Sequence, residues 1–196
     1  MRVTRAQAEE NRRAVIDAAS RLFRERGFDG IGLADLMRAA GLTHGGFYKQ
    51  FSSKDDLIAQ ACDRALATGA DKWTRIASSG RPDVLADLVR MYLARSHRDR
   101  IDDGCPLATL GPDVVRRDPA LRQRFEQGIR FHAGTLAAAM AASPARAQAH
   151  DPLAALSMMV GALLLSRMVE DEDLSGQILD SAIASLTGAL PPQSAT

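Results

Sequence analysis

Apolar residues recur along this chain at the spacing of amphipathic helices. In residues 12–26 they fall at intervals of three and four positions, which predicts a first helix that Gly27 ends. Residues 33–40 continue the same period until Gly41 breaks it. Thr43 then stands where a side chain can accept hydrogen bonds from the first backbone N–H groups of a new, very short helix. Two helices joined by such a tight turn predict a helix-turn-helix near the N-terminus.

The rest of the chain keeps the helical period in longer segments, and no stretch shows the alternation of a strand. A helix is expected from Lys54 to about Ser78, joining the N-terminal part to the remainder. Beyond it the pattern predicts a helix over 83–95, a polar loop through 104, a turn over 107–110, a helix over 118–142, a linker over 144–151, helices over 152–170 and 174–190, and a terminal tail. The expected fold class is all-α.

A helix-turn-helix places its second helix in the major groove of DNA, so this segment predicts DNA binding. Gly45 and Gly46 lack side chains and would let the backbone approach the groove floor. Tyr48, Lys49 and Lys54 offer hydroxyl and ammonium donors at phosphate reach. The predicted DNA-binding residues are Thr43, His44, Gly45 and Gly46 toward the bases and Tyr48, Lys49 and Lys54 toward phosphates, with Phe47 and Phe51 packed inward.

The same segment resembles the signature of the TetR/AcrR family of bacterial transcriptional regulators. That pattern runs as a glycine turn, a capping Ser or Thr, a glycine two positions on, then Tyr-x-His-Phe and Ser-Lys-x-x-Leu. The matching positions are Gly41, Thr43, Gly45, Tyr48, Phe51, Ser53, Lys54 and Leu57. The resemblance covers roughly the first third of the chain. Gln50 replaces the usual His, and Ile31 and Gly32 replace a common Thr and Ser, so one expected hydroxyl contact to phosphate is missing and the helix cap is weaker.

The net charge of +1 does not by itself mark a nucleic-acid binder, but its distribution is uneven. Residues 1–54 contain ten Lys and Arg against six Asp and Glu, whereas the remainder contains fifteen against eighteen. Positive charge therefore gathers at the end that carries the motif, as neutralising phosphates requires. Chance segregation accounts for so small an asymmetry equally well, so the charge counts only beside the motif.

The last two predicted helices are apolar over more than one face. Their apolar residues are Leu156, Met159, Val160, Leu163, Leu164, Met168, Ile178, Leu179, Ile183 and Leu186. In a chain of 196 residues this surplus favours burial against a second copy as a four-helix bundle, with an ordinary internal core as the alternative. The resemblance also implies a twofold homodimer through these helices. Such a dimer would read a palindrome with half-sites ~34–36 Å apart or somewhat more.

The segment between residues 73 and 132 mixes apolar and sparse polar side chains, as a small-molecule pocket needs. The resemblance implies an inducer site there that controls the two DNA-binding heads. The predicted ligand-binding residues are Trp73, Met91, Tyr92, Arg95, Cys105, Phe125 and His132. A packed core with hydrogen-bonded histidines is the alternative. Neither a cofactor motif nor a metal-ligand spacing is present in the sequence.

The two cysteines, Cys62 and Cys105, are too few for a disulfide framework. With an N-terminus that lacks the apolar run of a signal peptide, they predict free thiols in a reducing cytoplasm. The longest uncharged apolar run, 153–166, is too short to span a bilayer comfortably, so no membrane partner is expected. Cys62 lies in an apolar stripe and is expected to be inert. Cys105 precedes Pro106, which can start a helix, and an amide-rich helix N-terminus lowers a thiol pKa. This setting suggests sensing of oxidants or electrophiles as one hypothesis, and a plain packing or pocket cysteine is the alternative.

Two other functions are considered. One is a helical enzyme that uses Cys105 with His97 or His132 as nucleophile and base, although no orienting motif or phosphate loop supports it. The other is an architectural DNA binder without a ligand. The prediction preferred over both is a one-component regulator with a DNA-binding domain in residues 1–54 and a ligand-binding and dimerisation domain in residues 55–196. That it represses and is released by an inducer follows from the resemblance alone.

Overall fold

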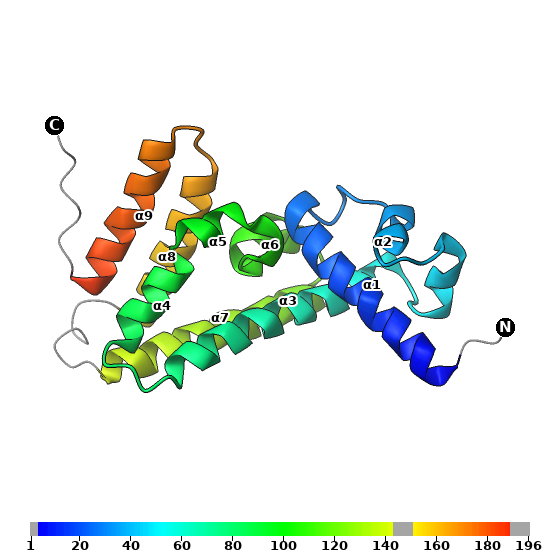
Figure 1. Ribbon diagram of the computed structural model, residues 1–196, viewed down its shortest axis with the longest axis horizontal. Coiled ribbons are helices and arrows are strands. Elements are labelled where there is room, and N and C mark those ends of the chain that lie inside the picture. Colours follow the sequence, from blue (N-terminus) through cyan, green and yellow to red (C-terminus); the bar gives the residue numbers. More distant parts are fainter. Residues whose placement is uncertain (1–3, 143–150, 189–196) are drawn as a thin grey trace.

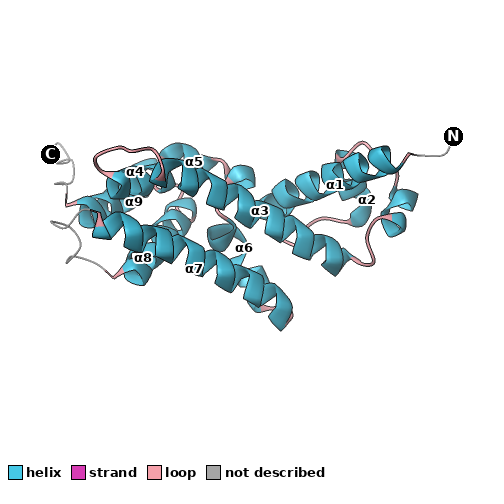
Figure 2. Ribbon diagram, turned by 90° about the horizontal axis from the view of Figure 1, so that it is seen from below, coloured by secondary structure: helices cyan, strands magenta, loops and turns pink. Residues whose placement is uncertain are grey.

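The described chain consists of helices and contains no strand (Figure 2). The computed structural model describes residues 4–142 and 151–188. The elements are α1 (Arg5–Arg26), α2 (Leu33–Ala39), the 3-10 helix η1 (His44–Lys49), α3 (Lys54–Ala77), α4 (Val84–Tyr92), α5 (Arg95–Asp99), the 3-10 helix η2 (Ile101–Asp103), α6 (Pro106–Val115), α7 (Pro119–Ala141), α8 (Pro152–Arg167) and α9 (Glu172–Thr187). The predicted all-α class is confirmed.

The molecule is elongated, with a head at one end and a larger body at the other (Figure 1). The head consists of α1, α2 and η1, and the body of α3 to α9. Helices α3 and α7 lie side by side along the long direction, and α3 runs from the head into the body. Motion at either end can therefore reach the other through one continuous helix.

Helix ends in the head are set by short local signals. The Thr4 hydroxyl accepts a hydrogen bond from the Gln7 backbone N–H at 3.2 Å and starts α1, seven residues before the predicted start. The apolar period misses this first part because its side chains are exposed. Gly27 and Gly41 both have φ of 72°, a left-handed conformation that a side chain would strain. These two glycines end α1 and α2.

The start of α3 is fixed by a capping arrangement. The Ser53 hydroxyl accepts a hydrogen bond from the Asp56 backbone N–H at 3.0 Å. The Asp56 carboxylate in turn accepts from the backbone N–H of Ser52 at 3.0 Å and from its hydroxyl at 3.1 Å. The backbone hydrogen bond is the main reason that the pKa of Asp56 lies below its ordinary value. The junction between η1 and α3 is thus held in one geometry.

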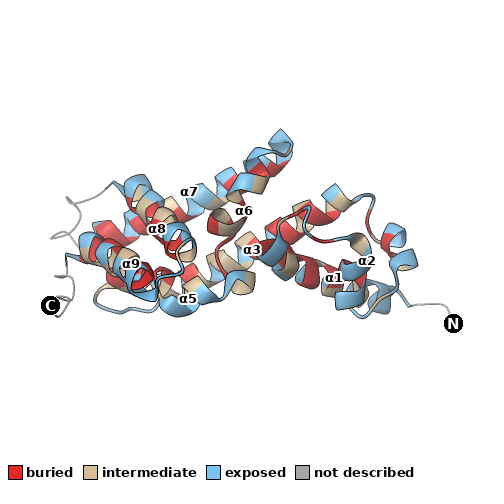
Figure 3. Cartoon of the chain, turned by 90° about the horizontal axis from the view of Figure 1, so that it is seen from above, coloured by how far each residue is buried: buried red, intermediate tan, exposed pale blue. Residues whose placement is uncertain are grey.

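Two apolar cores fill the molecule (Figure 3). The body core joins residues of α3, α4 and α6 to α9, such as Trp73, Leu88 and Leu163. The head core includes Phe23, Phe28, Ile31, Leu36, Met37, Phe47, Phe51, Leu57 and Ile58, together with Leu110, Val114, Leu121 and Phe125 from α6 and α7. Each fully buried Leu, Ile, Met or Phe contributes ~1.5–3 kcal/mol. Because the head core takes in body residues, head and body pack as one unit, and a domain boundary after residue 54 stays a prediction.

The segment between α4 and α7 differs most from the prediction. The helix expected over 83–95 ends at Tyr92, and α5 and η2 occupy the expected polar loop. The expected turn over 107–110 is a ten-residue helix, α6, with Pro106 in its first turn. Gly111 and Pro112 lie inside α6, and both are turn signals in sequence, although a proline there removes only one donor from the helix. Of the linker predicted over 144–151, only Asp151 is described, and it caps α8. Residues 144–150 and the terminal tail lie outside the described residues.

Candidate nucleic-acid interface and buried cavity

Helix η1 presents an exposed face at the end of the head. Tyr48 is 67% exposed, and its ring packs edge-on against Phe47 at a centroid distance of 5.1 Å. Phe47 is fully buried and stacks on Phe51, as predicted, so the two rings anchor η1 on the head core. Among the predicted DNA-binding residues the exposed ones are Thr43, His44, Gly45, Tyr48 and Lys49.

Gly45 has no structural reason to be glycine within the described chain. A Cβ atom built there meets no atom within 4 Å, and its φ is not positive. Gly46 is different, because a Cβ there would lie 3.7 Å from the Met37 methyl carbon, an ordinary contact. A glycine that folding does not require, on the exposed face of η1, is what close approach of an outside surface requires.

Two details of the predicted interface need correction. The Thr43 side chain makes no capping hydrogen bond, so the predicted cap is wrong. The 3-10 turn is closed instead by its own backbone, where the Gly46 N–H donates to the Thr43 carbonyl at 3.0 Å. The Lys54 ammonium donates to the Ile31 carbonyl at 2.9 Å and ties the start of α3 to the loop before α2. An ammonium has three donors, so a phosphate contact by Lys54 stays a prediction.

Arg12 positions η1, a role that the sequence did not reveal. Its guanidinium donates to the Gln50 backbone carbonyl and to the Gln60 side chain, the latter at 2.7 Å. The guanidinium carbon also lies 4.7 Å from the centroid of the Phe51 ring. These partners lie 38 and 48 residues along the chain, so no local pattern could predict the contacts. Arg12 thereby holds the end of η1 against α1 and α3.

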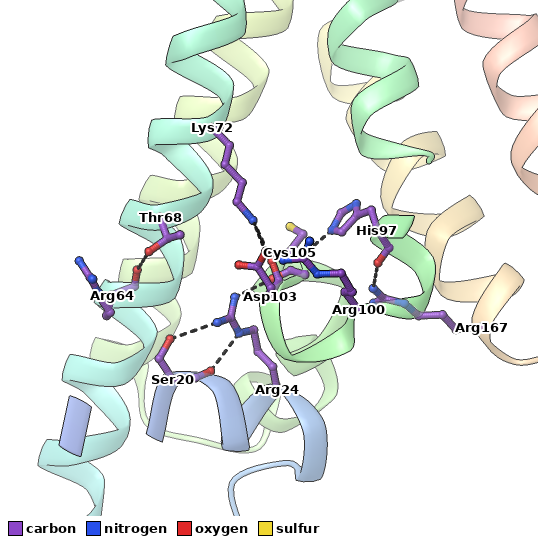
Figure 4. Close-up of polar contacts among 11 residues, drawn as sticks. Ser20, Arg24, Arg64, Thr68, Lys72, His97, Arg100, Asp103, Cys105 and Arg167 are labelled. Atoms are coloured by element: carbon purple, nitrogen blue, oxygen red, sulfur yellow. Dashed lines mark hydrogen bonds and ion pairs between the residues drawn. The ribbon is translucent and has the colours of Figure 1, made fainter. Parts of the chain in front are cut away.

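A cavity of about 200 Å³ lies between the body and α1, which contributes Arg24 to its lining. Figure 4 shows polar residues of its wall, among them Arg24, Lys72, His97 and Asp103. Its lining includes five of the seven predicted ligand-binding residues: Trp73, Met91, Tyr92, Cys105 and His132. The other lining residues are not among the predicted ones: Arg24, Gly69, Lys72, Ser96, His97, Arg100, Asp103 and Gly104. Arg24 comes from α1 in the head. Because α1 carries many charged residues, nothing in the sequence indicated that this one is buried.

The remaining two predicted ligand residues lie elsewhere. Phe125 belongs to the head core and is 5% exposed. It precedes His132 by seven residues on α7, which is ~10 Å along a helix and toward the head. Arg95 faces α9, since a Cβ atom on Gly176 would lie 2.6 Å from its guanidinium. Neither residue lines this cavity, and a role of either in ligand binding stays a prediction.

Charged groups converge on the turn that leads into α6 (Figure 4). Lys72 donates to the Asp103 carboxylate at 2.8 Å, and Arg100 pairs with the same carboxylate. Arg24 reaches from α1 and donates to the Gly104 carbonyl at 2.9 Å. The wall of the cavity is thus tied directly to the first helix of the head.

The two cavity histidines are held neutral by burial. His97 Nδ1 lies 2.6 Å from the Tyr92 carbonyl, and its Nε2 accepts the Cys105 backbone N–H at 3.0 Å. These contacts fix the proton on Nδ1, so Nε2 cannot act as a base toward the Cys105 thiol. Burial lowers the pKa of both His97 and His132. A nucleophile and base pair of Cys105 with His97 is therefore not formed.

Acid is expected to destabilise the fold through these histidines. Because their pKa is lowered in the folded chain, their contribution to stability is complete above the unfolded value of about 6.5 and is lost as the pH falls below it. Chemical unfolding between pH 7.5 and 5 should show a falling free energy of unfolding. His132→Asn should flatten that slope, while His44→Asn at an exposed position should keep it. An equal slope in His132→Asn would contradict this assignment.

The cysteines differ from the prediction at one site. Cys105 lies at the N-terminus of α6 as expected, without a side-chain capping hydrogen bond. Burial raises the pKa of its thiol, against the opposing influence of the Tyr92 hydroxyl and of the Leu107 and Ala108 backbone N–H groups. The predicted lowering of this pKa is wrong. A helix N-terminus stabilises a thiolate, but at Cys105 the free-energy cost of removing the thiolate from water is larger than this stabilisation. Cys62 is 1% exposed, so its predicted place in the core is confirmed. Burial raises the pKa of its thiol to about 12, and its inert character stays a prediction.

Comparison with known proteins identifies the family. A family model described as bacterial regulatory proteins, tetR family, matches residues 15–61, the segment that builds the head. The body agrees as well, because the crystal structure of reduced E. coli NemR superposes with a TM-score of 0.76 over 94% of this chain and 99% of that one, at 22% identity. Residues 15–61 thus belong to the tetR family of bacterial regulatory proteins, and the chain as a whole shares the fold of NemR.

Curated relatives within the TetR/AcrR family are named as transcriptional regulators, not enzymes. AcrR of Shigella flexneri is 37% identical over 59 residues, 30% of this chain and 27% of AcrR. A transcriptional repressor of Mycobacterium tuberculosis is 31% identical over 127 residues, 62% of this chain and 64% of that protein. The chain thus aligns with less than two thirds of the length of these relatives. AibR, solved with isovaleryl coenzyme A and operator DNA, shares the fold with a TM-score of 0.63, 19% identity and coverage of 90% and 97%.

The last two helices of the chain divide their apolar residues between an internal core and the surface. Leu156, Met159, Leu163, Leu179 and Leu186 belong to the body core. On the outer side, Leu165 is 53% and Met168 70% exposed, and Leu165 and Leu174 line an open apolar groove between α8 and α9. The internal core predicted as the alternative is therefore real, and an apolar outer face remains beside it. Within the described residues no helix is long and apolar enough to cross a membrane.

Proposed function

We propose that this chain is a sequence-specific DNA-binding repressor that acts as a homodimer on a palindromic operator and is released by a small molecule. The observation that carries the proposal is the exposed face of η1, where Gly45 opens the backbone to an approaching surface. Tyr48 and Lys49 flank that opening with a hydroxyl and an ammonium group. Thr43, His44, Gly45 and Gly46 are proposed to face bases, and Tyr48, Lys49 and Lys54 to face phosphates.

The homodimer is supported by the apolar outer face of α8 and α9. Exposed Leu165 and Leu174 line its groove together with Met158 and Ile178, and Leu164 and Met168 are exposed nearby in sequence. The polar residues of the groove are Gln177, Ser181 and Ser185. A second copy related by a twofold axis would bury the same face on both chains as a four-helix bundle. The two heads would then contact two half-sites of one duplex.

Release by a ligand is supported by contacts between the cavity and the head. Helix α6 begins at Cys105 on the cavity wall, while Leu110 and Val114 further along it lie in the head core. Arg24 forms a second connection through its hydrogen bond to the Gly104 carbonyl. A ligand that shifts this turn therefore moves groups packed against α1.

The repressor role is supported by names among the relatives. The Mycobacterium tuberculosis relative and NemR of E. coli are both called transcriptional repressors. A bacterial operator places the proposed action in the cytoplasm, where the free thiols Cys62 and Cys105 agree with a reducing environment.

The test of the function is selection of binding sites from random duplexes. The purified chain should enrich one inverted repeat, and bound duplex should decrease as salt rises, because phosphate contacts release counterions. Recovery of sequences without a shared repeat would contradict the proposal. A compound screen on the enriched duplex would then look for release.

Modification of Cys105 is a second proposed route of release. The thiol lines the same cavity, and the Leu107 and Ala108 backbone N–H groups favour its thiolate. Burial raises the pKa of this thiol, so its reaction at neutral pH should be slower than that of a free cysteine.

Cys105→Ser is expected to abolish release by N-ethylmaleimide or hydrogen peroxide while retaining full DNA binding in their absence. Cys62→Ser is the matched control and should be released as readily as the unaltered chain. The measurement is fluorescence anisotropy of a labelled operator before and after treatment. Normal release of Cys105→Ser by both reagents would remove this route.

A further inference from the structure

Two buried polar groups in the cavity wall lack the partners that their burial calls for. Arg24 is 7% exposed, yet its hydrogen bonds go to neutral oxygens of Ser20 and Gly104. No carboxylate of the described residues lies within 4 Å of its guanidinium. A buried cation without a counter-ion is costly, so an anion at this place would stabilise it.

The second group is the Tyr92 hydroxyl. Tyr92 is 1% exposed, and its hydroxyl oxygen is buried without a hydrogen-bond partner among the described residues. The Cys105 thiol is its polar neighbour and interacts with it, but sulfur is a weak acceptor and the hydroxyl has no oxygen or nitrogen partner among the described residues. A buried hydroxyl usually finds a partner, so this one points to a polar group supplied from outside the chain.

The side chains around the cavity carry more positive than negative charge, which favours an anion. Arg24, Lys72 and Arg100 line it, and Asp103 is the carboxylate that faces them. His97 and His132 add no charge, because burial lowers the pKa of each. Lys72 and Arg100 both form ion pairs with Asp103. Asp103 and Asp102 act on Arg24 only from beyond 4 Å, so Arg24 is the cation of this group that has no direct ion pair.

The size and walls of the cavity limit the body of the ligand. An apolar cavity of about 150 Å³ holds benzene. A cavity of about 200 Å³ thus admits one ring with a small polar group, and it is smaller than the ~300–1,000 Å³ of pockets for drug-sized ligands. Trp73 and His132, with ring centroids 4.4 Å apart and planes tilted by 58°, and Met91 supply an aromatic and apolar part of the wall.

We propose that the cavity binds a small aromatic carboxylate of about the size of benzoate. The ligand carboxylate pairs with Arg24 and competes with Asp103 for Lys72, the Tyr92 hydroxyl donates to the ligand, and the ring lies beside Trp73. The claim that this ligand acts as the inducer rests on the proposed function. The claim that it binds in the cavity does not. A carboxylate is a stronger acceptor than the Gly104 carbonyl, so it draws Arg24, a residue of the head, away from that bond.

Binding can be measured without DNA, because Trp73 is the single tryptophan of the chain and lines the cavity. Titration of the full chain with sodium benzoate should change the tryptophan fluorescence saturably. Benzamide, a neutral molecule of nearly the same shape, should bind at least tenfold more weakly. Equal affinities, or no saturable change with benzoate, would overturn the proposal.

Three variants separate ligand binding from folding. Tyr92→Phe should keep the melting temperature, since the hydroxyl lacks a partner, but weaken benzoate about tenfold, as the loss of a hydrogen bond to a charged group does. Asp103→Asn should strengthen benzoate severalfold, because the competing carboxylate is gone. Asp17→Asn makes the same charge change in an exposed ion pair with Arg64 and should leave the affinity unchanged. Weaker binding in Asp103→Asn, or unaltered binding in Tyr92→Phe, would contradict the proposed pose.

The operator assay distinguishes failure of this inference from failure of the proposed function. Benzoate should release the selected duplex at concentrations where the same amount of sodium chloride does not. If the chain binds its operator but benzoate fails to change Trp73 fluorescence, the ligand class is wrong and the DNA-binding function stands. If benzoate binds with the predicted variant pattern but the chain selects no duplex, the ligand class stands and the regulator proposal is wrong.

Discussion

Leu165→Glu is expected to leave the chain folded, convert the dimer to a monomer and reduce operator affinity by ~10²–10⁴-fold. Leu165 is 53% exposed on α8 and lines the apolar groove with Leu174, so its replacement removes little from the internal core. In a twofold dimer the variant would bury two unpaired carboxylates at one interface. The loss in DNA affinity arises because the second half-site then binds independently. Light scattering would report the mass, and anisotropy the affinity.

Val115→Glu is the matched control for this experiment. Val115 is 70% exposed on α6, so the same charge replaces an apolar side chain away from the α8 and α9 face. It should remain a dimer with nearly unchanged operator binding. A Leu165→Glu protein that stays dimeric and binds the operator normally would show that this face is not the dimer interface.

Gly45→Ala is expected to act in opposite directions on folding and on DNA binding. The free energy of unfolding should rise by up to ~0.5–1 kcal/mol, since alanine is a better helical residue and its Cβ meets no atom within 4 Å. Operator affinity should fall at least about tenfold, or ~1.4 kcal/mol, because the added methyl group occupies the space left for the duplex. Chemical unfolding and anisotropy on the same preparation would measure both effects.

Gly134→Ala provides the comparison. Gly134 is an exposed position of α7 in the body, and a Cβ there also meets no atom within 4 Å. It should gain the same stability without any loss of operator affinity. If Gly45→Ala binds the operator as well as Gly134→Ala does, the backbone at residue 45 does not approach DNA.

Helices and their ends could be predicted where the signal is local. Gly27 and Gly41 end helices because each needs a positive φ, and Ser53 starts one through a hydrogen bond three residues away. The segment from 93 to 115 could not be predicted in the same way. Gly111 and Pro112 are turn signals in sequence, yet tertiary packing of Leu110 and Val114 in the head core keeps them inside α6.

The candidate site also has a part that could be predicted from the sequence and a part that could not. The exposed residues of η1 follow from a short motif, whereas the cavity depends on contacts between distant residues. Arg24 meets Gly104 across 80 positions, and no periodicity reveals that bond. The pKa of Cys105 had the wrong predicted direction because its helix position is local information, but its removal from water is a property of the whole fold.

The most direct test of the account is the affinity and stoichiometry of the chain on its selected duplex and on a scrambled duplex of equal length at one salt concentration. The account predicts two chains per selected duplex and an affinity at least ~10³-fold above that for the scrambled one. Equal affinity for both duplexes, or a single chain saturating the selected one, would contradict a twofold repressor that reads DNA through η1.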